Sequence, residues 1–64
     1  MFPLYIIYVD REGTAGITGP FSEVDAPLEL NIRGRELKPG DELLLLDVAT
    51  LKIVDLRKRD FNES

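Results

Sequence analysis

The order of apolar and polar side chains divides the chain into short segments bounded by glycine and proline. Residues 4–9 are β-branched or aromatic and are apolar at both odd and even positions. Such a segment is typical of a strand that is covered on both faces. A glycine-containing turn follows, and we expect a short second strand over residues 15–18 that pairs with the first.

The middle of the chain has the clearest alternation. Residues 28–33 switch strictly between apolar and polar, with Leu28, Leu30 and Ile32 as the apolar members. A period of two predicts a half-buried strand whose three apolar side chains form one face of the core. Pro27, directly before this segment, leaves room for only one short helical turn.

The last third begins with a turn signature. Residues 37–41 read L-K-P-G-D, in which Pro39 and Gly40 suit the two central positions of a type II turn. Residues 42–47 read E-L-L-L-L-D, which is typical of a buried strand. The turn after them is weak, so a helix over residues 43–56 remains an alternative to a hairpin.

The final segment changes the side on which its apolar residues lie. Within residues 51–56 the alternation shifts between Ile53 and Val54. This shift predicts a β-bulge. Without a bulge, Asp55 would point into the core, where a carboxylate needs partners or a raised pKa.

These segments add up to five short strands with turns about every ten residues and no convincing helix. The pattern predicts an all-β fold, a small five-stranded barrel or roll with short Gly/Pro turns and little or no helix. We expect one domain over residues 1–56, followed by a charged tail over residues 57–64.

Composition narrows the chemistry. The 64 residues include no Cys, His or Trp, which excludes disulfides, thiolate metal sites and imidazole catalysis. The paired carboxylates of Asp10 with Glu12 and of Asp41 with Glu42 are candidates for a cation site or for a small hydrolase, but both pairs lie at turns and favour solvated surface charge. We therefore expect no enzyme activity, cofactor or metal, and a cytoplasmic location because the start lacks signal-peptide features.

The apolar surplus points to a partner. A single domain of this size has one interior and cannot cover both faces of two apolar strands, so we expect a homo-oligomer, most simply a dimer. The candidate interface residues are Tyr5, Ile7, Val9, Leu44 and Leu46. The function favoured by these features is a small interaction module that binds protein, such as an accessory, assembly or regulatory factor, including one of viral origin.

Charge disfavours nucleic acid as a partner. The chain has 8 basic and 12 acidic residues, a net charge of -4. The two basic clusters, residues 33–35 and 57–59, are interpreted as solubilising charges at a turn and in the tail. Residues 1–36 carry three Arg against six acids, which is not the basic face that DNA binding requires.

One resemblance suggests an alternative function. Residues 27–30 (P-L-E-L) and 37–43 (L-K-P-G-D-E-L) resemble the swapped-hairpin AbrB/MazE family, and residues 9–13 resemble its opening hairpin. The resemblance implies an intertwined dimer that binds DNA through basic N-terminal loops, as a transcription regulator or an antitoxin. The residues that would contact nucleic acid under this alternative are Arg11, Arg33 and Arg35.

Overall fold

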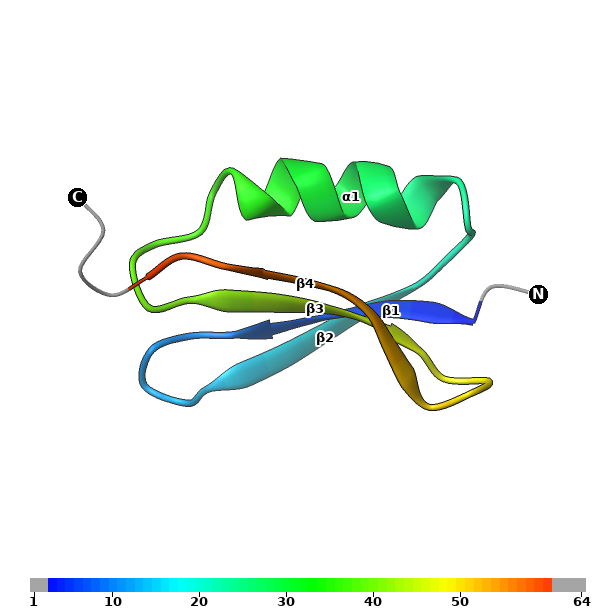
Figure 1. Ribbon diagram of the computed structural model, residues 1–64, viewed down its shortest axis with the longest axis horizontal. Coiled ribbons are helices and arrows are strands. Elements are labelled where there is room, and N and C mark those ends of the chain that lie inside the picture. Colours follow the sequence, from blue (N-terminus) through cyan, green and yellow to red (C-terminus); the bar gives the residue numbers. More distant parts are fainter. Residues whose placement is uncertain (1–2, 61–64) are drawn as a thin grey trace.

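A four-stranded antiparallel sheet carries a single helix across one of its faces (Figure 1). The computed structural model describes residues 3–60. The elements are β1 (Leu4–Val9), β2 (Ala15–Phe21), α1 (Asp25–Gly34), β3 (Glu42–Asp47) and β4 (Lys52–Lys58). The spatial order is β2-β1-β3-β4, so β1 and β3 are central and β2 and β4 form the edges.

The expected five-stranded barrel or roll with little or no helix is wrong, because the sheet is open and the segment taken for the third strand lies inside α1. In this helix Ala26 and Leu30, one turn apart, are buried against the sheet. Leu28 and Ile32 lie on the opposite side and are 57% and 53% exposed. The alternation therefore arises because the helix has two apolar stripes, each formed by residues four positions apart. Ala26 and Leu30 form the buried stripe, and Leu28 and Ile32 form the exposed one.

The start of α1 explains why proline does not stop it. The Ser22 hydroxyl oxygen accepts a hydrogen bond from the Asp25 amide (3.0 Å), and the Ser22 carbonyl accepts one from the Ala26 amide (2.9 Å). Pro27 is the third residue of the helix. In the first turn an N–H has no partner within the helix, so proline loses no hydrogen bond there.

The strands at the centre of the sheet agree with the sequence. The predicted bounds of β1 and β3 are confirmed. The type II turn before β3 is confirmed as well, since the Asp41 amide donates to the Lys38 carbonyl (2.9 Å) and Gly40 has a φ of +93°. Residues 43–56 form a hairpin and not the alternative helix.

The bulge predicted in the last strand is confirmed. Leu45 pairs with Asp55 and Leu46 pairs with Ile53, which leaves Val54 as the extra residue of β4. Because paired residues point to the same side of a sheet, Asp55 lies on the side of Leu45, under the helix layer but at the sheet edge. The expectation that a bulge would turn Asp55 away from the core is therefore wrong. Strict alternation from Ile53 would place Asp55 on the side opposite the core, and the bulge moves it to the core side, where it is half-buried.

Both edge strands are longer than expected. β2 runs on to Phe21, and a β-carbon at Gly19 would lie 2.8 Å from Cδ2 of Tyr5, so only glycine lets the tyrosine ring lie against this strand. β4 extends to Lys58, two residues into the segment assigned to the tail. The Arg59 amide then donates to the Asp41 carbonyl (3.1 Å), and residues 61–64 of that segment lie outside the described residues.

The core lies between α1 and the two central strands, on which the helix mainly packs. Its buried apolar side chains are Leu4, Ile6, Ala26, Leu30, Leu37, Leu43 and Leu45, and Phe21 packs against them. We call the side of the sheet that faces this core the covered face. In the part of the chain that the structure describes, no helix has the length and apolar content to cross a membrane.

Candidate functional site

The side of the sheet opposite α1, here called the open face, is crossed by a row of apolar side chains. Ile7 on β1 pairs with Ile17 on β2 and with Leu44 on β3, and Leu44 pairs with Leu56 on β4. Paired residues point to the same side, and their chain neighbours on β1 and β3 belong to the core. The row therefore lies on the open face and spans all four strands.

Further pairs extend this surface on both sides of the row. Tyr5 pairs with Leu46, and Leu46 pairs with Ile53. The apolar members of the open face are Tyr5, Ile7, Val9, Ala15, Ile17, Leu44, Leu46, Ile53 and Leu56. Its charged members are Glu42 and Lys58, which face each other across β3 and β4 at one end.

The five residues predicted as an interface lie together on this face. They are Tyr5, Ile7, Val9, Leu44 and Leu46, and they come from the two central strands. The sequence analysis missed Ile17, Ile53 and Leu56, because their place beside the central strands depends on the strand order. That these residues contact a partner stays a prediction.

Exposure differs between the centre and the edges of the open face. Ile17 and Ile53 are 62% and 61% exposed, while the apolar side chains of β1 and β3 on this face are half-buried by their neighbours. Nothing in the described part of the chain packs over them. A contiguous apolar surface of this kind marks an interaction site in a soluble protein.

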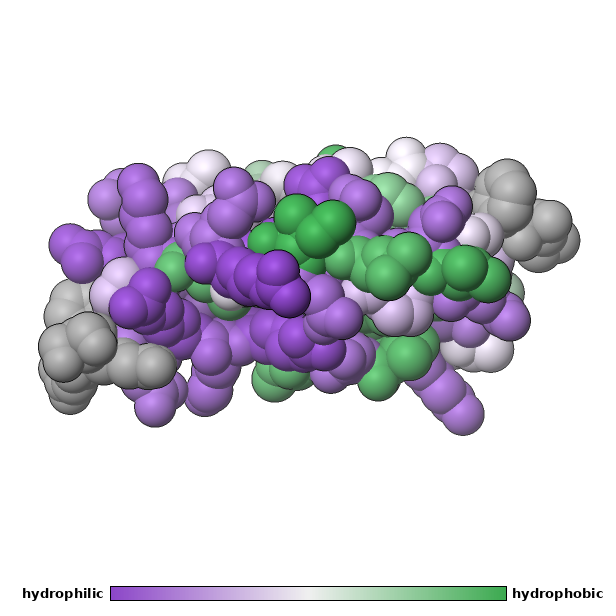
Figure 2. All heavy atoms as spheres, turned by 90° about the horizontal axis from the view of Figure 1, so that it is seen from above, coloured by the Kyte–Doolittle hydropathy of each residue, from purple (hydrophilic) through white to green (hydrophobic). Residues whose placement is uncertain are grey.

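A second apolar surface lies on the outside of α1. Val24, Leu28 and Ile32 are spaced four residues apart and form one exposed stripe. Seen from the helix side, apolar residues run across the middle of the molecule, with hydrophilic side chains above and below (Figure 2). This stripe is one side chain wide and is smaller than the open face, which is built from four strands.

Among the titratable groups, Asp41 has the most enclosed position. It is 4% exposed, and its carboxylate accepts hydrogen bonds from the Tyr8 hydroxyl (2.8 Å) and the Lys38 amide (3.1 Å). The bond from Tyr8 is the main reason why the pKa of Asp41 lies below its usual value, against the opposing effect of burial. The same bond raises the pKa of Tyr8. The pair ties β1 to the turn before β3 and has the features of a structural contact.

The carboxylate of Asp10 also has a local role in a turn. The Asp10 carboxylate accepts hydrogen bonds from the amides of Glu12 and Thr14, both at 2.9 Å, and so closes the turn between β1 and β2. Among residues 3–60, no group of three or more His, Cys, Asp or Glu side chains is placed to hold a metal ion.

The three arginines considered for nucleic acid are not brought together. Arg11 lies in the turn after β1 and lines a cleft that includes Tyr8 and Asp41. Arg33 pairs with Glu29 on the same helix at 3.3 Å, and Arg35 follows the end of α1 in a different cleft. They do not form the single basic surface that DNA binding through these residues would use.

The described residues form a two-layer, mostly β fold whose sheet has one apolar face that none of their other elements covers. Comparison of the chain with family models, with curated proteins and with solved structures gives no match.

Proposed function

We propose that this protein is a non-enzymatic interaction module that dimerises by packing the open face of its sheet against the same face of a second copy. The observation that supports this function is the apolar row across all four strands, Ile17–Ile7–Leu44–Leu56. Two sheets packed face to face about 10 Å apart form a core of interdigitating side chains. A second copy would supply the layer that α1 supplies on the covered face.

Charge on the open face favours a second copy as the occupant. The whole chain has a net charge of -4, but this face carries one acid, Glu42, and one base, Lys58, which sum to zero (1 − 1). A two-fold interface brings a surface against itself, so that surface must not repel its own copy. The charges elsewhere on the chain stay outside the contact and keep the dimer soluble.

The area of the open face sets the expected affinity of the dimer. Strands of six or seven residues, about 3.3 Å per residue and about 4.8 Å apart, outline roughly 400 Å² before side-chain relief is added. This is below the ~800 Å² per partner of a standard interface. We therefore expect a reversible dimer with a dissociation constant on the order of micromolar.

The test is the molecular mass as a function of concentration, measured by sedimentation equilibrium or light scattering. We expect the wild-type protein to be a dimer at about 100 µM and to dissociate on dilution. Leu44→Lys places a charge in the middle of the apolar row and should give a folded monomer. The matched control is Leu28→Lys, which makes the same change on the exposed stripe of α1 and should leave the dimer intact.

Two results would contradict the proposed function. One is a wild-type chain that stays monomeric at about 100 µM with a cooperative thermal melt. The other is a dimer that Leu28→Lys dissociates and Leu44→Lys does not, because the interface would then be the helix stripe.

A further inference from the structure

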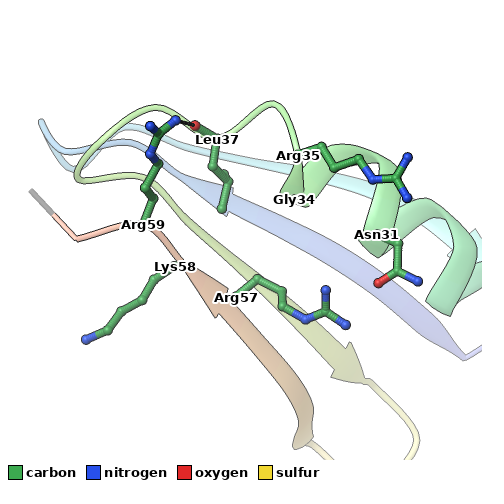
Figure 3. A pocket seen from close by; sticks show the side chains of 7 residues that line it. All are labelled: Asn31, Gly34, Arg35, Leu37, Arg57, Lys58 and Arg59. Carbon is green, nitrogen blue, oxygen red and sulfur yellow. Dashed lines mark hydrogen bonds between the residues drawn. The ribbon is translucent and has the colours of Figure 1, made fainter. Parts of the chain in front are cut away.

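The two basic clusters, 22 residues apart when counted from Arg35 to Arg57, meet in one cleft (Figure 3). The cleft lies between the C-terminal end of α1 and the end of β4 and has a volume of about 470 Å³. Four of its lining residues are basic: Arg35, Arg57, Lys58 and Arg59. Together they are half of the basic residues of the chain.

The arrangement of the two layers creates this cleft. α1 packs mainly on β1 and β3, and the edge strand β4 lies beside β3 at the margin of this contact. Arg57 pairs with the buried Leu43 and therefore points to the helix side. Its Nη1 atom lies 4.0 Å from the position of a β-carbon at Gly34, so the guanidinium reaches the end of α1.

The side chains in the cleft have different roles. Arg59 donates from Nη1 to the Leu37 carbonyl (3.0 Å), which ties the end of β4 to the segment after α1. The side chain of Lys58 points away from Asn31, whereas those of Arg35, Arg57 and Asn31 extend toward the same end of the cleft (Figure 3). Two guanidinium groups and one amide thus lie at one end of the cleft.

The electrostatics of the cleft are strongly positive. None of the described residues that line it is acidic, and the nearest paired carboxylate is Asp55, 3.4 Å from Nη2 of Arg57. Counting Asp55 and leaving out Lys58, whose side chain belongs to the open face, the local charge is +2 (3 − 1). Among residues 3–60, no carboxylate pairs with Arg35. The rest of the chain, with 5 basic and 11 acidic residues, has a charge of -6 (5 − 11).

We propose that this cleft binds the phosphate monoester group of a small ligand. A monoester carries up to two negative charges and three terminal oxygens, which suits two planar guanidinium forks and an amide donor. A carboxylate has one charge and two oxygens and would leave half of the positive charge unbalanced. Nucleic acid presents many phosphates along an extended surface, and the acidic remainder of the chain repels such a ligand.

The first test is an NMR titration of the ¹⁵N-labelled protein with inorganic phosphate, and with acetate at the same ionic strength. Phosphate should bind saturably with a dissociation constant on the order of millimolar, and shifts should concentrate at residues 31–35 and 57–59. Arg35→Gln should weaken binding at least about fivefold, because this side chain pairs with no described carboxylate and its loss leaves the fold intact. The matched control Lys52→Gln removes one exposed positive charge at the far end of β4 and should change the affinity less than about twofold.

A second pair of variants tests the geometry without removing an arginine. Gly34→Asp places a carboxylate opposite the Arg57 guanidinium and should abolish phosphate binding, whereas Gly34→Ala adds only a methyl group and should retain it. Gly34 is helical, so both substitutions are compatible with the backbone, and thermal melts confirm folding. Loss of binding in both variants alike would contradict the proposed geometry.

Titrations with adenosine monophosphate and with free phosphoserine distinguish the sources of the phosphate group. Tighter binding of either than of inorganic phosphate supports the proposal and assigns the ligand class. Non-saturating shifts spread over all basic residues, or acetate binding as tight as phosphate binding, would overturn it. Binding of duplex DNA with steep salt dependence and about tenfold tighter than adenosine monophosphate would overturn it in favour of nucleic acid.

Discussion

The covered and open faces of the sheet are made of the same kinds of side chain but have different surroundings. On β3, Leu43 and Leu45 are 2% and 4% exposed beneath α1, while Leu44 and Leu46 on the open face are only half-buried. The four consecutive leucines therefore lie alternately on the covered face and the open face. Sequence composition does not distinguish these surfaces; the position of the helix does.

The helix repeats this contrast on a smaller scale. Leu30 is 1% exposed and belongs to the core, whereas Leu28, two residues earlier, is 57% exposed. Both the sheet and the helix therefore have one apolar side that is used within the chain and one that is not. Under the proposed function, partners act on the unused sides, and the open face of the sheet is the larger of the two.

The largest expected effect comes from placing a charge on each face of β3. Leu45→Lys buries an ammonium group without a partner and should cost on the order of 5 kcal/mol, as much as the whole free energy of unfolding of a small domain. Leu44→Lys leaves its charge at the surface of the monomer and should stay folded. Circular dichroism of both variants at low concentration checks this, and equal loss of structure would show that the open face is also part of the monomer's core.

A smaller effect separates the two sides of α1. Leu30→Ala opens a cavity in the core and should lower the free energy of unfolding by roughly 2–5 kcal/mol. Leu28→Ala removes a side chain that packs little and should change it by less than about 0.5 kcal/mol. Urea denaturation measures both values, and similar values for the two would contradict the assignment of the buried stripe.

The contribution of the Tyr8–Asp41 hydrogen bond to the stability of the fold should depend on pH. The pKa of Asp41 is lowered in the folded state, so this carboxylate stabilises the fold above its ordinary value of about 3.9, and the contribution is lost as pH falls through the lower folded value. Tyr8→Phe removes the main cause of this shift. The variant should therefore be less stable than the wild type at pH 7, and the difference should narrow below pH 4.

The alkaline side provides a check on the same contact. The pKa of Tyr8 is raised, so its contribution is present below the ordinary tyrosine value near 10 and is lost as pH rises through the folded value. Urea denaturation across the pH range measures the loss of stability on both the acidic and the alkaline side. A constant difference between wild type and Tyr8→Phe from pH 2 to pH 7 would show that the hydrogen bond does not control the pKa of Asp41.

The smallest expected effect lies at the edge of the open face. Ile17→Thr reduces the apolar area that β2 contributes to the open face but keeps a β-branched side chain. The free energy of unfolding of the monomer should therefore change by less than about 0.5 kcal/mol. The dimer dissociation constant should rise several-fold, as measured by dilution. An unchanged dissociation constant would place β2 outside the contact.

The predictions from sequence that the structure confirms concern segments whose conformation is set by their own residues and close neighbours. Leu4–Val9 and Glu42–Asp47 are strands with the predicted bounds, and the Pro-Gly turn before β3 has the expected conformation. In these segments, β-branched or apolar runs and a proline followed by a glycine restrict the backbone without help from distant residues. The bulge at Val54 was also readable, because a period of two cannot change side without an extra residue.

The helix could not be read in the same way. Three apolar residues at alternate positions satisfy a strand with one buried side, and they also satisfy a helix with an apolar stripe on each side. Pro27 would count against a helix only if it lay beyond the first turn. It is the third residue of α1, so it does not oppose this helix. Which pattern applies depends on whether Leu30 meets a sheet, which is a tertiary fact.

By itself, the sequence determined the central strands, the turn before β3, the bulge and the apolar excess on both faces of the central strands, because backbone preferences and side-chain alternation act over a few residues. Only the tertiary structure decided which face α1 covers, that Ile17 and Leu56 complete the open face, and that Arg35 and Arg57 share a cleft. Strand order and helix placement bring together residues far apart in the chain. Such contacts follow from the burial of one common core, which no short stretch of sequence contains.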